Sequence, residues 1–158
     1  MAGERLDGTQ GGGADVVFHA FDIVMDIGAY RDLHRHRRCH QFRQAYTTAL
    51  GYDTPEVIAE AGLRPLYSSA VKEVHAIFHE LPAPGREYLL PFSTLSRFLF
   101  KMDFAEVEYM SRLRSGVKGH FSYRRIAWEM KQALSRLDAS LSRIIDATPP
   151  WIEDPLQR

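Results

Sequence analysis

The sequence predicts an α+β domain in which helices pack on a small antiparallel sheet. Residues 16–25 (VVFHAFDIVM) are rich in β-branched and aromatic residues, as in a strand that is covered on both faces. Residues 92–102 (FSTLSRFLFKM) alternate well enough to form a second strand. From Ile126 to Ile145, apolar residues recur at steps of three and four, which predicts one long amphipathic helix that Pro149-Pro150 stops.

Two aspartates follow the predicted strands directly and carry helix-start signals. Asp26 can cap a helix that runs to about Arg38, because its carboxylate can accept hydrogen bonds from the free backbone N–H groups of the first turn. Asp103 and Glu106 have the spacing of a capping box, which predicts a helix that runs to about Leu113. Each strand is therefore expected to lead straight into a helix.

The chain is expected to form one domain over residues 16–148. Residues 1–15 are rich in glycine and predict a flexible lead-in, and residues 149–158 form a C-terminal tail. Helices are predicted from residue 54 to 62 and from 66 to 80, between the two strands. Two strands are too few for a stable sheet. We therefore expect another chain or a missing segment to complete it, through a homo-oligomer (a dimer or tetramer) or a partner domain.

The composition is that of an ordinary globular protein, with 158 residues of which 45% are hydrophobic and 25% are charged. Twenty basic residues balance twenty acidic ones, so the net charge does not indicate a nucleic-acid or membrane partner. No apolar run approaches the ~20 residues that span a bilayer, and the N-terminus lacks the apolar core of a secretory signal. The single cysteine, Cys39, fits a reducing compartment. These features predict a cytoplasmic protein.

A dense basic cluster lies at residues 31–43 (RDLHRHRRCHQFR), where eight of thirteen residues are Arg or His and one is acidic. An anion among these cations would relieve their repulsion, and arginine suits phosphate because its planar fork donates two parallel hydrogen bonds. On a helix, Arg35, His36 and Arg37 would point about 100° apart and would contact separate parts of an extended ligand. A solvated basic face at a helix C-terminus is the alternative, and both stay open.

Three other functions of this cluster are less well supported. His36 and His40 could bind a metal from one helical face, but no further ligand is suitably spaced, and we predict no metal site. Cys39 lies between Arg38 and His40, which would lower its pKa and favour a nucleophile, although packing is the more common role of such a residue. Aromatic residues within the cluster occur also in single-strand RNA binders, but there is no platform motif and no net positive charge.

Two stretches resemble the flavin-dependent thymidylate synthase family. The first, VVFHAFDIVMDIGAYRDLHRHRRCHQFRQAY, resembles the family's apolar strand followed by a helix that ends in Arg-His-Arg, here Arg35, His36 and Arg37. The second, REYLLPFSTLSRFLFKMDFAEVEYMSRLR, resembles the family's Leu-Pro segment, second strand and following helix, which ends here in Leu113 and Arg114. The likeness covers roughly residues 16–145, and the order of the two blocks supports it more strongly than the tripeptide alone.

The resemblance implies a homo-oligomeric enzyme that methylates dUMP to dTMP with methylene-tetrahydrofolate, FAD and NADPH. It assigns Arg35, His36 and Arg37 to the flavin, which suits their chemistry because such donors can bind a pyrophosphate and stabilise a reduced flavin. It assigns Arg114 to the nucleotide, both as a substrate-binding residue and as the catalytic residue that polarises the pyrimidine.

Several positions depart from the family's pattern. After Arg-His-Arg the family continues with spaced Ser, Asn, Ser, Arg and Tyr, several of which hold the nucleotide. Without gaps, these positions are here His40, Phe42, Ala45, Thr47 and Thr48. The phosphate-binding arginine is therefore absent unless Arg43 and Tyr46 replace it through a local shift, which makes Arg43 a candidate substrate-binding residue. The family's later asparagine and histidine correspond to Tyr109 and Lys118.

Two functions stay open after the sequence analysis. The first is an FAD-dependent thymidylate synthase. The alternative is a catalytically degenerate domain of the same fold that binds a flavin or a nucleotide, or that supports an active partner. Because a lost charge-assisted contact costs on the order of 1.5–3 kcal/mol, we expect the isolated chain to have little or no synthase activity.

Overall fold

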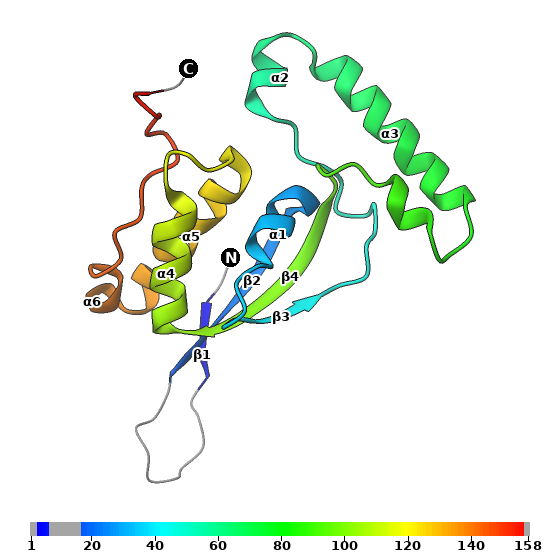
Figure 1. Ribbon diagram of the computed structural model, residues 1–158. Helices are drawn as coiled ribbons and strands as arrows, with labels where there is room; N and C mark the ends of the chain where they lie inside the picture. The colour runs from blue at the N-terminus through cyan, green and yellow to red at the C-terminus, as the bar shows by residue number, and fades with distance from the viewer. Residues whose placement is uncertain (1–2, 7–16, 157–158) are drawn as a thin grey trace.

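A computed structural model, which describes residues 3–6 and 17–156, contains a four-stranded antiparallel sheet with helices against one face (Figure 1). The strand order is β1-β2-β4-β3, and β2 and β4 pair along their whole length at the centre of the sheet. The strands are β1 (Gly3–Leu6), β2 (Phe18–Asp26), β3 (His40–Arg43) and β4 (Leu95–Asp103). The predicted α+β class is confirmed.

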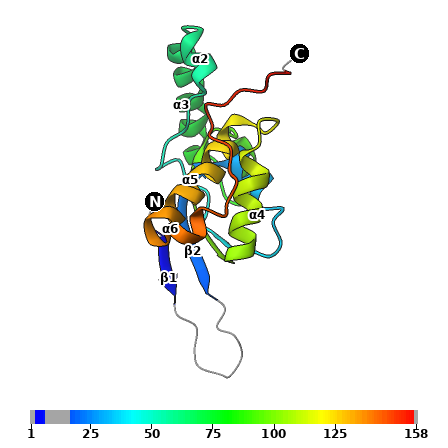
Figure 2. The ribbon, with the colours of Figure 1, turned by 90° about the vertical axis from the view of Figure 1, so that its left-hand side faces the viewer.

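The helices form a body over the sheet and an arm that extends from it (Figures 1 and 2). In the body, α1, α4 and α5 pack together and against the strands, whereas α2 and α3 project away with the short 3-10 helix η1. The helices are α1 (Ile27–Leu33), α2 (Glu56–Glu60), α3 (Arg64–Glu80), η1 (Arg86–Leu89), α4 (Phe104–Ser115), α5 (Phe121–Leu137) and α6 (Ala139–Ser142). Among the described residues, no helix has the length and apolar character needed to cross a membrane.

Two aspartate caps connect the central strands to the helices above them. The Asp26 carboxylate accepts a hydrogen bond of 2.7 Å from the backbone N–H of Ala29, and Asp103 accepts one of 2.9 Å from Glu106. Both caps satisfy a backbone donor of the first helical turn, as their spacing predicted. The helices α1 and α4 consequently start at the ends of β2 and β4, on the same side of the sheet.

The core lies between the helices and one face of the sheet. Large apolar side chains from the strands fill it: Phe21, Ile23, Met25, Phe98, Phe100 and Met102. The opposite face is open, and Val24 (46% exposed) and Leu99 (40% exposed) lie on it beside an ion pair between Asp22 and Arg97. The prediction that the first strand is covered on both faces is therefore wrong for the described residues, because the helices that contact the sheet, α1, α4 and α5, pack on the other face.

The sheet obtains its outer strands from this chain, which corrects the expectation that another chain or a missing segment must supply them. Residues 40–43 pair with β4, and Gly3–Leu6 pairs with β2. The remainder of the predicted flexible lead-in, residues 1–2 and 7–15, lies outside the described residues. At the other end, the tail contacts α5, where the rings of Trp128 and Trp151 meet edge to face at 5.6 Å.

Two predicted helix ends are wrong. The first helix stops at Leu33 and not at Arg38, because the chain turns so that His36 and Cys39 enter the core. The predicted long final helix divides at Asp138, whose backbone is extended (φ −146°) and whose carboxylate accepts hydrogen bonds from the backbone of Ser140 and Leu141. An aspartate that caps a new helix competes with continuation of the old one.

Candidate functional site

The Arg-His-Arg tripeptide lies in the link between α1 and β3 and not on a helix. His36 is 5% exposed, whereas Arg35 and Arg37 point their side chains into solvent. Gln41 holds the link in place, since its Nε2 donates to the backbone oxygen of His36 at 2.9 Å. The tripeptide therefore presents two cations outward around one buried imidazole.

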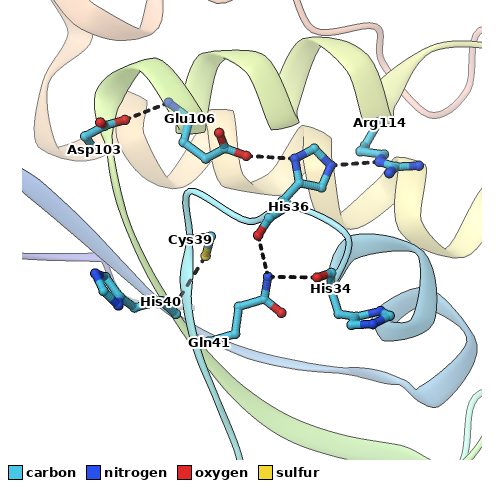
Figure 3. A network of polar contacts seen from close by, with 8 residues as sticks. All are labelled: His34, His36, Cys39, His40, Gln41, Asp103, Glu106 and Arg114. Carbon is cyan, nitrogen blue, oxygen red and sulfur yellow. Dashed lines mark hydrogen bonds and ion pairs between the residues drawn. The ribbon is translucent and has the colours of Figure 1, made fainter.

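This imidazole is the middle member of a buried relay of hydrogen bonds, between Glu106 and Arg114 (Figure 3). His36 Nδ1 lies 2.8 Å from Glu106 Oε1, and Arg114 Nε donates to His36 Nε2 at 2.9 Å. An arginine can only donate, so Nε2 accepts and the proton of a neutral His36 is on Nδ1, where it donates to the Glu106 carboxylate. The two ends of the relay come from α4, one at its first turn and one at its last.

Burial lowers the pKa of His36, and the nearby Arg114 charge lowers it further, while the Glu106 carboxylate opposes both effects. The side chains of His36 and Glu106 are 3% and 6% exposed. Desolvation of this extent disfavours an imidazolium, which agrees with the tautomer that the hydrogen bonds require. His36 is thus a neutral acceptor for Arg114.

Two tyrosine rings contact residues of the relay. The Tyr109 ring meets the His36 ring edge to face at 5.7 Å, and the Arg114 guanidinium lies 5.7 Å from the centre of the Tyr123 ring. Tyr123 also lines a hollow of about 720 Å³ between α1, the segment before α2 and the start of α5. Arg114 therefore contacts a residue that lines a space of the size that encloses a small organic ligand, about 300–1,000 Å³.

The exposed arginines of the link differ in their partners. Arg35 lies 3.8 Å from Asp32, and Arg38 forms an ion pair with Asp103. Arg37 makes no ion pair with any of the residues that the structure describes. It is the cation of the tripeptide that is freest to bind an external anion.

Cys39 does not have the character of a nucleophile. Its side chain is buried, and burial raises the pKa of its thiol to about 12, with a smaller contribution from the Glu106 charge. The expectation that the basic neighbours lower this pKa is wrong, because Arg38 is paired with Asp103 and His40 faces solvent. His36 and His40 also do not share a helical face, and both His36 ring nitrogens are engaged.

Glu106 is the site residue that the sequence analysis did not identify. Its spacing from Asp103 indicated only a helix start, and the backbone N–H of Glu106 does receive that cap. Its side chain, however, is buried at 5% residue exposure, which is rare for a carboxylate without a partner. The sequence signal that could have identified Glu106 is an acidic residue at a core-facing position of a helix, in a chain that has a dense basic cluster elsewhere.

Comparison with known proteins identifies the family. Residues 14–138 match the family of the thymidylate synthase complementing protein. The chain belongs to this family. The UPF0159 protein of Chlamydia muridarum is 36% identical over 121 residues, which cover 75% of this chain and 23% of the relative.

Two other relatives agree with this assignment. The UPF0159 protein of Chlamydia pneumoniae is 33% identical over 118 residues (73% of this chain, 22% of the relative), and that of Thermoplasma acidophilum is 31% identical over 136 residues (83% and 27%). The chain spans about a quarter of the length of these relatives. The family resemblance drawn from the two sequence blocks is therefore confirmed.

The structure brings together some of the predicted site residues and separates others. His36 and Arg114, which the resemblance assigned to different ligands, are directly hydrogen-bonded. Arg43 lies at the end of β3, where its Nη1 donates to the Tyr46 hydroxyl at 3.0 Å. Lys118, at the position of a family histidine, forms an ion pair with Asp154 in the tail.

Proposed function

We propose that this chain takes part in FAD-dependent thymidylate synthesis, the reductive methylation of dUMP to dTMP with methylene-tetrahydrofolate and NADPH. The observation that carries the proposal is the relay, which joins the two family motifs at one point. Arg35 and Arg37 flank its buried histidine, and Arg114 ends it next to Tyr123, which lines the hollow. Cations from both motifs are thus available to ligands that meet there.

The link suits the pyrophosphate of FAD. Arg35 and Arg37 are exposed guanidinium groups two residues apart, and Arg37 has no acidic partner among the described residues. Charge-assisted hydrogen bonds from arginine to phosphate are about twice as strong as neutral ones, and the buried His36 fixes the backbone that carries both arginines. When bound, FAD would supply the hydride that reduces the transferred methylene group to a methyl group.

Arg114 is suited to orient and polarise a pyrimidine. Its Nε is occupied by His36, so its terminal Nη groups remain available to donate to a carbonyl oxygen. A guanidinium that is already oriented stabilises negative charge on that oxygen without reorganisation during the reaction. We assign Arg114 this catalytic and substrate-binding role, and His36 the role of holding it.

The chain spans about a quarter of its relatives, and we propose that it acts in a larger assembly. The open sheet face and the exposed link at residues 34–38 suit a homo-oligomer, a dimer or tetramer, in which residues 27–46 lie at or near an interface. The partners that we propose are other copies of the chain and small nucleotides in the cytoplasm.

A second candidate is a domain that binds nucleotide or flavin without turnover. It is favoured by the residues at the family's nucleotide positions, since Lys118 is engaged by Asp154 and Tyr109 packs against His36. The same positions in the first block are Ala45 and Thr47, which offer no guanidinium. The two candidates differ in activity and share the flavin site.

Flavin binding tests what both candidates share. We expect the wild-type protein to bind FAD in titration calorimetry, and Arg37→Ala to weaken binding by about tenfold or more, because a charge-assisted contact is lost. Arg143→Ala, at an exposed arginine that follows α6 and does not line the hollow, is the matched control and should bind like wild type. Absence of FAD binding by the assembled wild-type protein would contradict the proposal.

Turnover separates the two candidates. The assay contains dUMP, methylene-tetrahydrofolate, FAD and NADPH and measures dTMP, beside rescue of a thymidine-requiring bacterial strain. Turnover that Arg37→Ala and Arg114→Ala both abolish supports the enzyme. FAD binding without turnover supports the second candidate.

A further inference from the structure

Residues 147–154, near the end of the described chain, form a strap that follows α6 and returns past α4 and α5 (Figures 1 and 2). The strap begins in the core, where Ala147 is 6% exposed. Further along it, the Trp151 ring meets the Trp128 ring of α5 edge to face at 5.6 Å. The strap contains no helix or strand, so contacts with side chains of the helices must hold it in place.

Arg124, in the first turn of α5, is the main anchor of the strap. Its Nη2 donates to the backbone oxygens of Ile152 at 2.8 Å and Pro149 at 3.4 Å, and its Nε donates to that of Ser115 at 3.1 Å. Arg124 is 7% exposed, and a buried guanidinium is costly unless its donors are satisfied. These hydrogen bonds therefore tie the strap and the end of α4 to one fixed group.

The end of α4 that Arg124 holds is the turn that carries Arg114. Ser115 is the last residue of α4, and its backbone oxygen is one of those that a helix leaves without an intrahelical partner. A cation that donates to this oxygen stabilises the last helical turn. Ser115 also binds the strap directly, because its Oγ accepts from the backbone N–H of Thr148 at 2.8 Å. The turn that carries Arg114 is thus attached both to Arg124 and to the strap.

The loop between α4 and α5 packs on the same anchor. A methyl group at Gly119 would lie 2.7 Å from Tyr123 Cε2 and 3.0 Å from Arg124 Cγ, so glycine is required for this close approach. Tyr123 carries the ring next to the Arg114 guanidinium, and both Gly119 and Tyr123 line the large hollow. A displacement of Arg124 would therefore change this wall of the hollow as well as the end of α4.

We propose that Arg124 and the strap are positioning elements of the site, which hold Arg114 and the adjacent wall of the large hollow in the geometry that binds a ligand. The inference rests on the proposed function for the identity of that ligand and deepens it. The strap lies beyond residues 14–138, which match the family, so the match assigns it no role. The ion pair between Lys118 and Asp154 is a weaker attachment of the strap, because the Lys118 side chain is 73% exposed and exposed ion pairs contribute little.

The test follows the Nε–H of Arg114, which donates to His36 Nε2 and gives its own signal in ¹H–¹⁵N spectra of the full chain. In Arg124→Met, which keeps an apolar stem against the loop but donates no hydrogen bond, we expect this proton to exchange with water about tenfold faster or more. Arg124→Lys retains a cation that can donate to some of the carbonyl oxygens. It should therefore recover part of the protection.

Trp151→Ala tests the strap without a change in α4 or α5. Trp151 is 69% exposed, so the variant should fold and should loosen the strap by the loss of its contact with Trp128. We expect faster exchange of the Arg114 proton, by a smaller factor than in Arg124→Met. Phe78→Leu, a core substitution on α3 away from the strap, is the matched control. It should lower the urea midpoint and leave the exchange at the wild-type rate.

Calorimetry with dUMP distinguishes this inference from the proposed function. We expect Arg124→Met to weaken dUMP binding by about tenfold, and Phe78→Leu to bind like wild type. A wild-type protein that does not bind dUMP would reject the proposed function, and proton exchange would still decide whether the strap positions Arg114. The inference is overturned if Arg124→Met and Trp151→Ala exchange at the wild-type rate, or if Phe78→Leu accelerates exchange equally. Faster exchange in Arg124→Met with unchanged dUMP binding would also overturn it.

Discussion

Removal of the Glu106 carboxylate tests the relay most directly. The side chains of Glu106 and His36 are 6% and 3% exposed, and one hydrogen bond of 2.8 Å joins them. In Glu106→Leu the Nδ1–H of His36 loses its acceptor and has little access to water. A hydrogen bond to a charged group is worth about 1.5–3 kcal/mol, so we expect the free energy of unfolding to fall by about this amount.

Glu106→Gln provides the graded comparison. Its amide oxygen can still accept from His36 Nδ1, so we expect a smaller loss, on the order of 1 kcal/mol for a neutral hydrogen bond. Glu73→Leu on α3 is the matched control, because Glu73 is exposed on a helix. Surface substitutions of that kind usually change stability by less than about 0.5 kcal/mol.

Urea denaturation at pH 7.5 measures these differences. Imidazole ¹⁵N shifts provide a second readout, since the wild type should show a neutral His36 with its proton on Nδ1. Loss of Glu106 weakens the preference for that tautomer, and the Arg114 donor at Nε2 retains part of it. The reasoning is refuted if Glu106→Leu and Glu73→Leu have the same stability, or if His36 in the wild type carries its proton on Nε2.

Three further predictions follow from the same structure. Burial lowers the pKa values of His36 and His75, so below pH ~6.5 the unfolded chain binds protons that the folded chain does not. The free energy of unfolding should therefore be highest above pH ~6.5 and should fall as the pH falls below it. The urea midpoint should be lower at pH 5.5 than at pH 7.5. Because the pKa of Cys39 is raised from 9.0 to about 12, its alkylation by iodoacetamide at pH 8 should be about 1,000-fold slower than in denaturing urea, and equal rates would contradict the burial. Light scattering at micromolar concentration should give the mass of a dimer or tetramer, and a monomeric mass would exclude the proposed self-association.

Local signals predicted the central part of the fold. Both caps were evident from the sequence because a cap requires only an aspartate at a fixed spacing from the backbone N–H that it receives. The outer strands were not evident. Residues 40–43 (HQFR) have no strand pattern, and they become a strand because β4 offers its free edge to them. Edge pairing of this kind depends on tertiary contacts more than on intrinsic propensity.

The candidate site was predictable in its composition but not in its arrangement. The basic cluster and Arg114 were identified from the two sequence blocks. The division of the tripeptide into one buried and two exposed residues depends on Glu106, which is 70 positions from His36 along the chain. Basic residues after an apolar stripe also resemble a helix C-terminus, which explains why α1 was predicted to be too long.

Replacement of the whole relay by apolar residues tests whether these polar residues serve stability or ligand binding. Replacement of a buried polar or ionic network by apolar residues of similar volume is often neutral or stabilising by about 1–4 kcal/mol, whereas removal of one member leaves the others unsatisfied. We therefore expect the triple variant Glu106→Leu, His36→Phe, Arg114→Met to be more stable than Glu106→Leu alone. The same variant should bind dUMP more weakly, because it lacks the Arg114 guanidinium next to Tyr123, a residue that lines the large hollow. Urea denaturation and calorimetry with dUMP measure the two effects on one sample. A triple variant that is less stable than Glu106→Leu would show that the relay is required by the fold itself, and a triple variant that still binds dUMP like wild type would remove Arg114 from the site.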